Sequence, residues 1–158
     1  MMDERAFTRM LLENEQMLYR IACGLLRSEE DRRDAMQDAA LKAWQNRKNL
    51  REEKHCKTWL VRILINECHS LCRKKKREMI AEPRPTTSKA ELEAVEMRLM
   101  LELLPEKQRI PIVLHYMEGF SLEEIGQTLQ IPVSLVKSRM YQARKALRVE
   151  MKDEEGSK

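Results

Sequence analysis

Apolar residues in the first half of the chain recur at intervals of three and four, the spacing of one face of an α-helix. The first stripe predicts a helix from about Phe7 to Leu25. Ser28, with Asp31 three positions later, has the form of a capping box and predicts the start of a second helix. A third stripe begins at Trp59 and runs toward a basic segment. The predicted stripes are Phe7, Met10, Leu11, Met17, Leu18, Ile21, Ala22 and Leu25; then Ala35, Met36, Ala39, Ala40, Ala43 and Trp44; and then Trp59, Leu60, Ile63, Leu64 and Leu71.

Two polar segments interrupt this pattern. The first, from Gln45 to Lys54, is predicted to be a loop. The second, from Ala81 to Lys89, contains two prolines among hydroxyl and charged residues, so it can neither continue a helix nor bury a face. We therefore expect a flexible linker at residues 80–90, between one domain at 1–79 and another at 91–152. Ser88 with Glu91 has the form of a capping box that reopens helical structure.

The apolar pattern after the linker predicts a second helical block. Pro105 fits a first helical turn, where its missing N–H is tolerated. Pro111 lies inside the pattern and predicts a kink or a tightened turn. The segment from Glu118 to Phe120 breaks the helix. The stripe of this block is Leu92, Val95, Leu99, Leu103, Ile112, Val113 and Tyr116.

The segment from Ser121 to Leu147 has the pattern of a helix-turn-helix. Ser121 and Glu124 form a capping box, a short helix runs to Leu129, a tight turn follows, and a second helix begins near Ser134. Gly126 is placed where the two helices would cross closely. The positions predicted to face inward are Leu122, Ile125, Leu129, Leu135 or Val136, Met140, Ala143 and Leu147.

The outer face of that second helix is rich in groups that bind DNA. Lysine, arginine and glutamine side chains can read base edges in the major groove, and further cations can contact phosphates. The alternative interpretation is a solvated basic face on an ordinary helical pair. The candidate DNA-binding residues are Ser134, Lys137, Ser138, Arg139, Gln142, Arg144 and Lys145.

Composition supports an all-α fold of two small helical domains. Aromatic residues make up 4% of the 158 residues and there are only four glycines, which argues against a β-sandwich. The net charge of +4 is modest, but Arg73 to Arg77 contains five consecutive cations. No apolar stretch is long enough for a transmembrane helix, and the N-terminus has an amphipathic pattern, so we expect a cytoplasmic protein that does not insert into a membrane.

Several motifs together resemble the extracytoplasmic-function (ECF) subfamily of bacterial sigma factors. LPEKQR (Leu104–Arg109), EGFSLEEI (Glu118–Ile125) and VKSRMYQARK (Val136–Lys145) are similar to region 4 of that family. DAMQDAALKAW (Asp34–Trp44) is similar to region 2.2. TWLVRI (Thr58–Ile63), followed by Asn66 and the basic run, is similar to regions 2.3 and 2.4. The resemblance implies a factor that binds core RNA polymerase and directs promoter-specific transcription initiation.

The resemblance also implies roles for particular residues. The helix-turn-helix would read the −35 element as duplex. The N-terminal domain would capture a flipped base of the opened −10 element, using the polar loop and the third helix; there Trp59 is either a core residue or a stacking platform. Region 2.2 would dock on the clamp helices of polymerase. The implied −10 residues are Lys42, Leu50, Lys57, Trp59, Arg62, Asn66, Arg73, Lys74, Lys75, Lys76 and Arg77, and the implied polymerase-binding residues are Asp34, Gln37, Asp38, Leu41 and Lys42.

The same resemblance implies further partners, and this sequence departs from the family pattern at several positions. The polymerase flap and an anti-sigma factor are implied partners, and the linker is either a passive tether or a segment near the polymerase active-site channel. Leu50 stands where the family commonly has Phe, and Gln142 replaces a frequent Arg. Gln130 stands in a turn where Gly is common, so a left-handed conformation there would carry a small cost.

Three other functions are alternatives to this one. A dimeric helix-turn-helix regulator would explain residues 121–147 but leave the first 80 residues without a role. A metal or redox site is conceivable because Cys68 and Cys72 are four apart on a helix. An enzyme is disfavoured, since no catalytic constellation or phosphate-binding loop is present and no cofactor is implied. The residues of the metal alternative are His55, Cys56, Cys68, His69 and Cys72.

Overall fold

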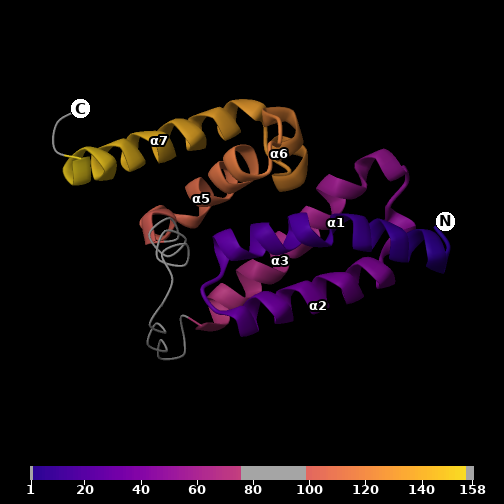
Figure 1. Ribbon diagram of the computed structural model, residues 1–158. Helices are drawn as coiled ribbons and strands as arrows, with labels where there is room; N and C mark the ends of the chain where they lie inside the picture. Colours follow the sequence, from indigo (N-terminus) through magenta and orange to yellow (C-terminus); the bar gives the residue numbers. More distant parts are fainter. Residues whose placement is uncertain (1, 76–98, 156–158) are drawn as a thin grey trace. The chain divides into compact units, whose positions relative to one another are not determined.

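The computed structural model describes residues 2–75 and 99–155, and these residues contain helices and turns without a β-strand. They divide into two units. The N-terminal unit contains α1 (Glu4–Leu25), α2 (Glu29–Gln45) and α3 (Cys56–Lys75). The C-terminal unit contains α5 (Glu106–Ile112), η3 (Val113–Met117), most of α6 (Leu122–Leu129) and α7 (Val133–Glu155) (Figure 1). The predicted all-α class with two helical domains is confirmed.

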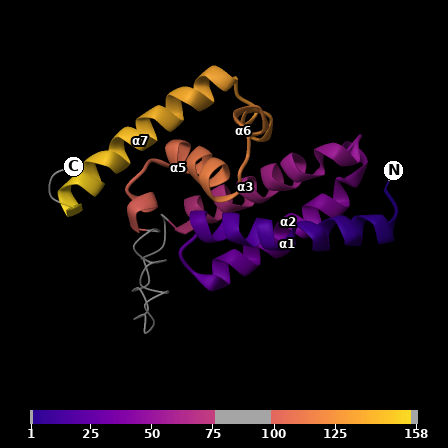
Figure 2. The same ribbon diagram turned by 45° about the horizontal axis from the view of Figure 1, so that its top comes forward.

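In the N-terminal unit each of the three long helices packs against the other two. Figures 1 and 2 show them side by side. The small residues Ala35, Ala39 and Ala43 form the buried stripe of α2, which lets the neighbouring backbones approach closely. Leu18 and Ile21 of α1 and Leu64 of α3 are among the buried side chains around that stripe. The expected stripes of α1 and α2 are therefore confirmed at their central positions, while Leu11, Met17, Met36, Ala40 and Trp44 are half-buried.

Side chains close the ends of α1 and α2. Asp3 caps α1 by accepting from the backbone N–H of Ala6 at 2.8 Å, so this helix begins before the first predicted apolar position. Ser28 caps α2 by accepting from the N–H of Asp31 at 3.1 Å, as its spacing predicted. The buried side chain of Arg32 donates to the carbonyl of Leu26 at 3.1 Å. That bond satisfies a carbonyl at the end of α1 and holds the α1–α2 turn.

The segment from α2 to α3 differs from the sequence prediction in two respects. The polar loop contains two short 3₁₀ helices, η1 (Arg47–Asn49) and η2 (Glu53–His55). The buried face of α3 includes Val61, Ile65 and Cys68, whereas the predicted Ile63 and Leu71 are half-buried. The buried face is wider than the predicted stripe and is turned about the helix axis relative to it, because α3 packs against both α1 and α2. The predictions for Lys76, Arg77, the linker 80–90, Ser88, Leu92 and Val95 concern positions outside the described residues.

The start of the C-terminal unit corrects part of the predicted apolar stripe. Residues 99–102 are helical, but Leu99 and Leu103 are exposed, Leu103 by 63%. Leu101 and Leu104 are buried in their place. The helix ends in a turn at residue 103, so the helical period does not carry the stripe through to Leu104. Pro105 then stands as the N-cap of α5, one residue before the first helical turn that it was predicted to join.

The guanidinium of Arg109 stabilises this turn through hydrogen bonds to backbone carbonyls. It donates from Nε to the carbonyl of Leu101 at 2.9 Å and from Nη2 to that of Leu104 at 3.0 Å. Both acceptors lie where the preceding helix ends and its carbonyls lack helical partners. Arg109 thus plays the same part here that Arg32 plays at the end of α1.

Pro111 has a different effect from the predicted kink or tightened turn. It lies inside α5, and the chain continues directly into η3, a wider π-helical segment. Proline has no N–H and crowds the preceding turn, so the ladder of helical bonds is disturbed near this point, and such disturbances are often absorbed as π-helix. The segment ends at Gly119 with φ of +71°, and the Phe120 N–H bonds to the Leu114 carbonyl at 3.0 Å.

The helix-turn-helix prediction is confirmed. Of the positions expected to face inward, Ile125, Met140 and Ala143 are buried, whereas Leu122, Leu129 and Leu147 are half-buried. Ser121 and Glu124 make both bonds of the capping box, each at 3.0 Å. Gln130 ends α6 in the left-handed conformation, with φ 58° and ψ 46°. A Cβ on Gly126 would stand 2.9 Å from the Ile131 carbonyl oxygen in the turn and 3.6 Å from a side-chain methyl group of Val133, the first residue of α7. Of the two candidates for the first inward position of α7, Val136 is buried and Leu135 is exposed.

Candidate nucleic-acid interface

The buried residues of α7 define which of its faces points outward. Val136, Met140 and Ala143 are fully covered, and they lie on one side of a helix with 3.6 residues per turn. The opposite side carries Ser134 and Ser138, and two turns beyond Ser138 it carries Lys145. The predicted residues Lys137 and Gln142 border this side and are exposed as well. Five of the seven predicted −35 residues therefore share one accessible surface, which we call the α7 outer face: Ser134, Lys137, Ser138, Gln142 and Lys145.

The two predicted arginines lie on opposite flanks of the α7 outer face. By helical position Arg139 is on the Gln142 side and Arg144 is on the Lys137 side, and both are half-buried. The Arg144 guanidinium donates from Nη1 to the hydroxyl oxygen of Tyr116 at 2.9 Å. The seven predicted residues are thus brought together on one helix, with the cations spread across its width.

Tyr141 was not among the residues predicted to bind DNA. Its side chain is 59% exposed, and it lies three positions after Ser138 and four before Lys145, in the middle of the α7 outer face. An aromatic ring there can make apolar contact with a thymine methyl group. The signal was available, because the helical spacing that places Ser138 and Lys145 outward also places Tyr141 outward.

In the N-terminal unit, the residues predicted to bind polymerase lie on exposed parts of α2. Asp34, Gln37 and Asp38 are all exposed. Leu41, one turn further along, is an apolar side chain exposed by 56%. An exposed leucine beside polar groups is suited to a protein contact, although single exposed apolar residues are also common.

Lys42 has a partner that the sequence analysis did not identify. Its ammonium group forms an ion pair with the carboxylate of Glu67 on α3, and the Glu67 side chain is only 8% exposed. Lys42 was predicted to touch both polymerase and the −10 element. The ion pair gives it a structural role between α2 and α3 in addition to either predicted contact.

Four of the predicted −10 residues form a stripe on α3, and others lie outside it. Trp59, Arg62, Asn66 and Arg73 recur at intervals that place them along one stripe of the helix, opposite its buried face. Lys57, at the start of α3, projects from a different side of the helix. Lys74 is exposed about a quarter turn around the helix from the stripe, and Leu50 is half-buried in the preceding loop. The stripe is compatible with a strand of nucleic acid running along the helix; Lys75 is the last residue of α3.

The loop before α3 is anchored by an aromatic stack. Trp44 packs edge-on against Phe7, with ring centroids 5.2 Å apart. The guanidinium of Arg47 lies 3.7 Å above the Trp44 ring and donates from Nη1 to the Trp44 carbonyl at 2.8 Å. The first turn of the predicted −10 loop is therefore held against the helical core.

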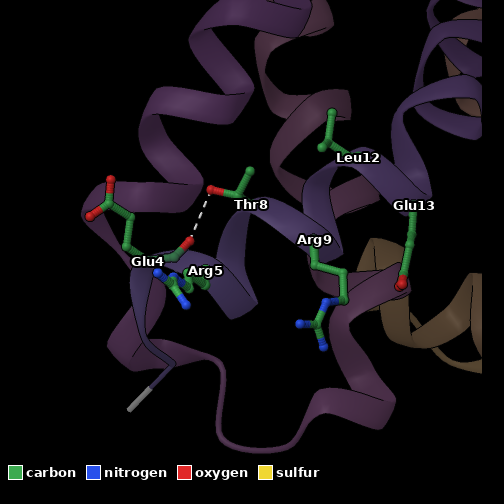
Figure 3. Close-up of a pocket in the computed structure, with 6 residues that line it drawn as sticks. All are labelled: Glu4, Arg5, Thr8, Arg9, Leu12 and Glu13. Atoms are coloured by element: carbon green, nitrogen blue, oxygen red, sulfur yellow. Dashed lines mark hydrogen bonds between the residues drawn. The ribbon is translucent and has the colours of Figure 1, made fainter.

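A pocket on α1 lies outside every predicted site. It has a volume of about 590 Å³, and all the residues that line it come from α1, as Figure 3 shows. Its lining mixes charges of both signs, and the only bond drawn within it runs from the Thr8 hydroxyl to the Glu4 carbonyl at 2.9 Å. We assign it no function. Its residues are Glu4, Arg5, Thr8, Arg9, Leu12 and Glu13.

The metal alternative gains no support from the part of the chain that is described. Residues 2–75 and 99–155 contain no cluster of three or more histidine, cysteine or acidic side chains arranged to hold a metal ion. No disulfide links the four cysteines. Burial raises the pKa of the Cys56 thiol above its usual value, which disfavours the thiolate that a metal would need.

The described helices include none whose length and apolar character would suit a membrane span.

Comparison with known proteins identifies similar sequences over both units. The family description "Sigma-70 region 2" matches residues 10–78, and "Sigma-70, region 4" matches residues 94–147. The ECF RNA polymerase sigma factor SigM of Mycobacterium tuberculosis is 31% identical over 92% of this chain and 76% of its own length. The ECF RNA polymerase sigma factor SigW of Bacillus subtilis is 29% identical over 96% of this chain and 91% of its own length.

A solved structure shows the same likeness in three dimensions. The sigma factor RpoE of Bartonella quintana, determined in complex with the anti-sigma factor NepR, superposes with a TM-score of 0.79 at 28% identity. The match covers 92% of this chain and 96% of that one. The likeness therefore extends over both helical units and is not limited to the helix-turn-helix.

Proposed function

This chain belongs to the ECF family of RNA polymerase sigma factors, which direct promoter-specific transcription initiation, and we propose that its two helical units divide promoter recognition between them. The C-terminal unit reads the −35 element as duplex DNA. The N-terminal unit binds core polymerase and the −10 element as it opens. The observation that best supports this division is the α7 outer face, which gathers polar and cationic side chains opposite the buried side of a helix-turn-helix.

The −35 contact follows from the shape and chemistry of α7. In a helix-turn-helix the second helix enters the major groove, which is wide enough to admit it. Gln142 and Lys145 are then candidates to read base edges, and Tyr141 to contact thymine methyl groups. Lys137, Arg139 and Arg144 are placed toward the sides of the helix, where the phosphate backbones border the groove. These cations should make promoter binding steeply dependent on salt.

The −10 contact uses the stripe on α3 and the anchored loop before it. A base taken out of its stack costs a few kcal/mol, which specific contacts must offset. Asn66 supplies an amide that can both donate and accept hydrogen bonds, and Arg62 and Arg73 supply charges for the strand's phosphates. Trp59 lies on the same stripe and can stack on a base, which keeps both interpretations of this residue open.

The polymerase contact is assigned to the exposed part of α2 around Gln37, Asp38 and Leu41. The chemistry of RNA synthesis then belongs to polymerase, and this chain contributes recognition. We also propose that an anti-sigma factor covers these binding surfaces until a signal releases it, by analogy with the complex of the Bartonella sigma factor. The domain bounds 1–79 and 91–152 and the linker between them are part of the same proposal.

The deciding experiment is transcription in vitro with bacterial core polymerase and a pooled promoter library. With this protein present, transcripts should start a fixed distance from a shared motif with two parts. The same library without the protein is the control. If the protein gives no specific initiation and instead binds a palindromic DNA site by itself as a dimer, the regulator of another class becomes the correct assignment.

A further inference from the structure

Tyr116 lies on η3 but reaches α7. Its side chain is 57% exposed, and its hydroxyl oxygen accepts the Nη1–H of Arg144 at 2.9 Å, although the two residues are 28 positions apart. The ring of Tyr116 also packs edge-on against His115, with centroids 4.9 Å apart. His115 is itself bonded through Nδ1 to the Phe120 carbonyl at 2.8 Å. The Tyr116 ring therefore has a fixed support on the turn before α6.

The chemistry of this pair leaves both members able to bind an anion. A tyrosine hydroxyl that accepts one hydrogen bond still has its own O–H to donate. A guanidinium carries five N–H donors in a rigid fork, and the bond to Tyr116 uses one of them. Tyrosine is neutral, so it orients the arginine without cancelling its charge, as a carboxylate partner would. The pair thus presents a positive charge and an additional O–H donor from neighbouring atoms.

The position of Arg144 on α7 indicates which anion the pair would bind. Arg144 lies on the same flank of the helix as Lys137, two turns before it, and the exposed Arg148, one turn after it. A row of cations beside a groove-reading face is placed to follow one phosphate backbone. We propose that Tyr116 and Arg144 together bind one DNA phosphate along this flank, with Tyr116 as the residue that positions the guanidinium. The proposal rests on the function proposed for the C-terminal unit.

The test uses holoenzyme assembled from the full chain and core polymerase, on a promoter taken from the library experiment. Equilibrium binding is measured between about 50 and 200 mM salt for wild type, Tyr116→Phe, Arg144→Gln and the double variant. Tyr19→Phe is the matched control, because it removes a hydroxyl from α1 in the other unit. Thermal unfolding of each variant shows whether the fold is retained.

The expected pattern separates positioning from charge. Tyr116→Phe should weaken binding about three- to tenfold, the effect of one typical hydrogen bond at an exposed site, with little change in salt slope. Arg144→Gln should weaken binding and also lower the slope of log K against log salt by about 0.9. Tyr116→Phe should add little in the Arg144→Gln background. A methylphosphonate scan of the −35 half should find one position whose neutralisation costs affinity in wild type and not in Arg144→Gln.

Two results would overturn the proposal. Tyr116→Phe could bind as wild type does, or the two substitutions could act additively, which would mean that the hydroxyl does not act through the guanidinium. Failure of the proposed function is distinct, because it would appear as a lack of promoter-specific initiation by the wild-type protein.

Discussion

Lys42 on α2 and Glu67 on α3 form an ion pair in which the carboxylate is nearly covered and the ammonium group is half-exposed. Truncating Lys42 would leave a covered negative charge without its partner, which is costly even after solvent screening is allowed for. We expect Lys42→Ala to lower the free energy of unfolding of the N-terminal unit by about 1–2 kcal/mol and Glu67→Gln to lower it by less. Both tryptophans, Trp44 and Trp59, lie in this unit, so tryptophan fluorescence during urea unfolding measures the change.

The same two variants separate the structural role of Lys42 from its predicted contacts. Glu67→Gln keeps the lysine but removes its charged partner. If Lys42 contacts polymerase or DNA, Glu67→Gln should remain active while Lys42→Ala loses activity at a temperature where both are folded. Equal destabilisation by the two variants would contradict the ion-pair account.

Gln130 is a non-glycine residue in the left-handed conformation, at φ 58°. The left-handed region costs a residue with a Cβ about 1–2 kcal/mol, and glycine avoids that cost while losing more entropy on folding. Gln130→Gly should therefore raise the stability of the C-terminal unit by about 0.5 kcal/mol. Gln130→Ala is the control, since it removes the side chain and keeps the Cβ. The prediction is wrong if Ala and Gly have the same effect in far-UV circular dichroism unfolding.

The two described glycines of the C-terminal unit should respond differently to a methyl group. At Gly126 the new Cβ would meet the Ile131 carbonyl oxygen at 2.9 Å, whereas at Gly119 nothing lies within 4 Å. Gly126→Ala should cost about 1–3 kcal/mol through backbone displacement, and should weaken −35 recognition because it moves the turn before α7. Gly119→Ala should cost about 1 kcal/mol through its positive φ alone and should leave recognition intact. The reverse order in DNA binding would contradict the turn contact.

The hydroxyl of Tyr19 hydrogen-bonds to the Glu29 carboxylate, and this bond, followed by the nearby Arg33 and Arg32, lowers the pKa of Glu29. The same bond raises the pKa of Tyr19. A lowered folded-state pKa at Glu29 adds stability above its unfolded pKa, and that stability is lost as pH falls through the folded value. A raised pKa at Tyr19 adds stability below its unfolded pKa, lost as pH rises through the folded value.

It follows that Tyr19→Phe should move the Glu29 pKa up toward its ordinary value and reduce the loss of stability on acidification. NMR titration of the Glu29 side-chain carboxyl tests this directly. Arg33→Gln is a useful comparison because it removes a hydrogen bond and a positive charge that also lower the Glu29 pKa. An unchanged Glu29 titration in Tyr19→Phe would show that the hydroxyl does not set this pKa.

The proposed division of promoter recognition predicts that two substitutions impair different steps of initiation. Arg139→Ala on α7 should reduce promoter-specific transcription while polymerase binding stays intact, because it removes a contact to the −35 duplex. Asn66→Ala on α3 should impair promoter opening and −10 selection more than duplex binding. Permanganate footprinting and a −10 library measure these steps separately. Loss of polymerase binding in Arg139→Ala, or an unchanged −10 preference in Asn66→Ala, would count against the assignment.

Local sequence signals determined much of this protein. The capping box at Ser121 and the extent of α6 were predicted correctly, because each depends on residues within a few positions of one another. The buried stripe of α2 was predicted for the same reason, since helical spacing alone brings Ala35, Ala39 and Ala43 to one face. The roles of the predicted site residues stay predictions.

Only the tertiary structure decided which residues from distant segments meet. Three examples are the ion pair of Lys42 with Glu67, the hydrogen bond of Arg144 with Tyr116 and the buried side of α3. Each depends on how the helices pack, because packing sets the rotation of each helix about its axis, and the apolar period of a single helix does not specify that rotation. Leu103 is exposed because the helix ends beside it, at a turn held by the Arg109 side chain. A sequence pattern indicates which residues a segment can bury. Which of them are buried depends on the segments that pack against it.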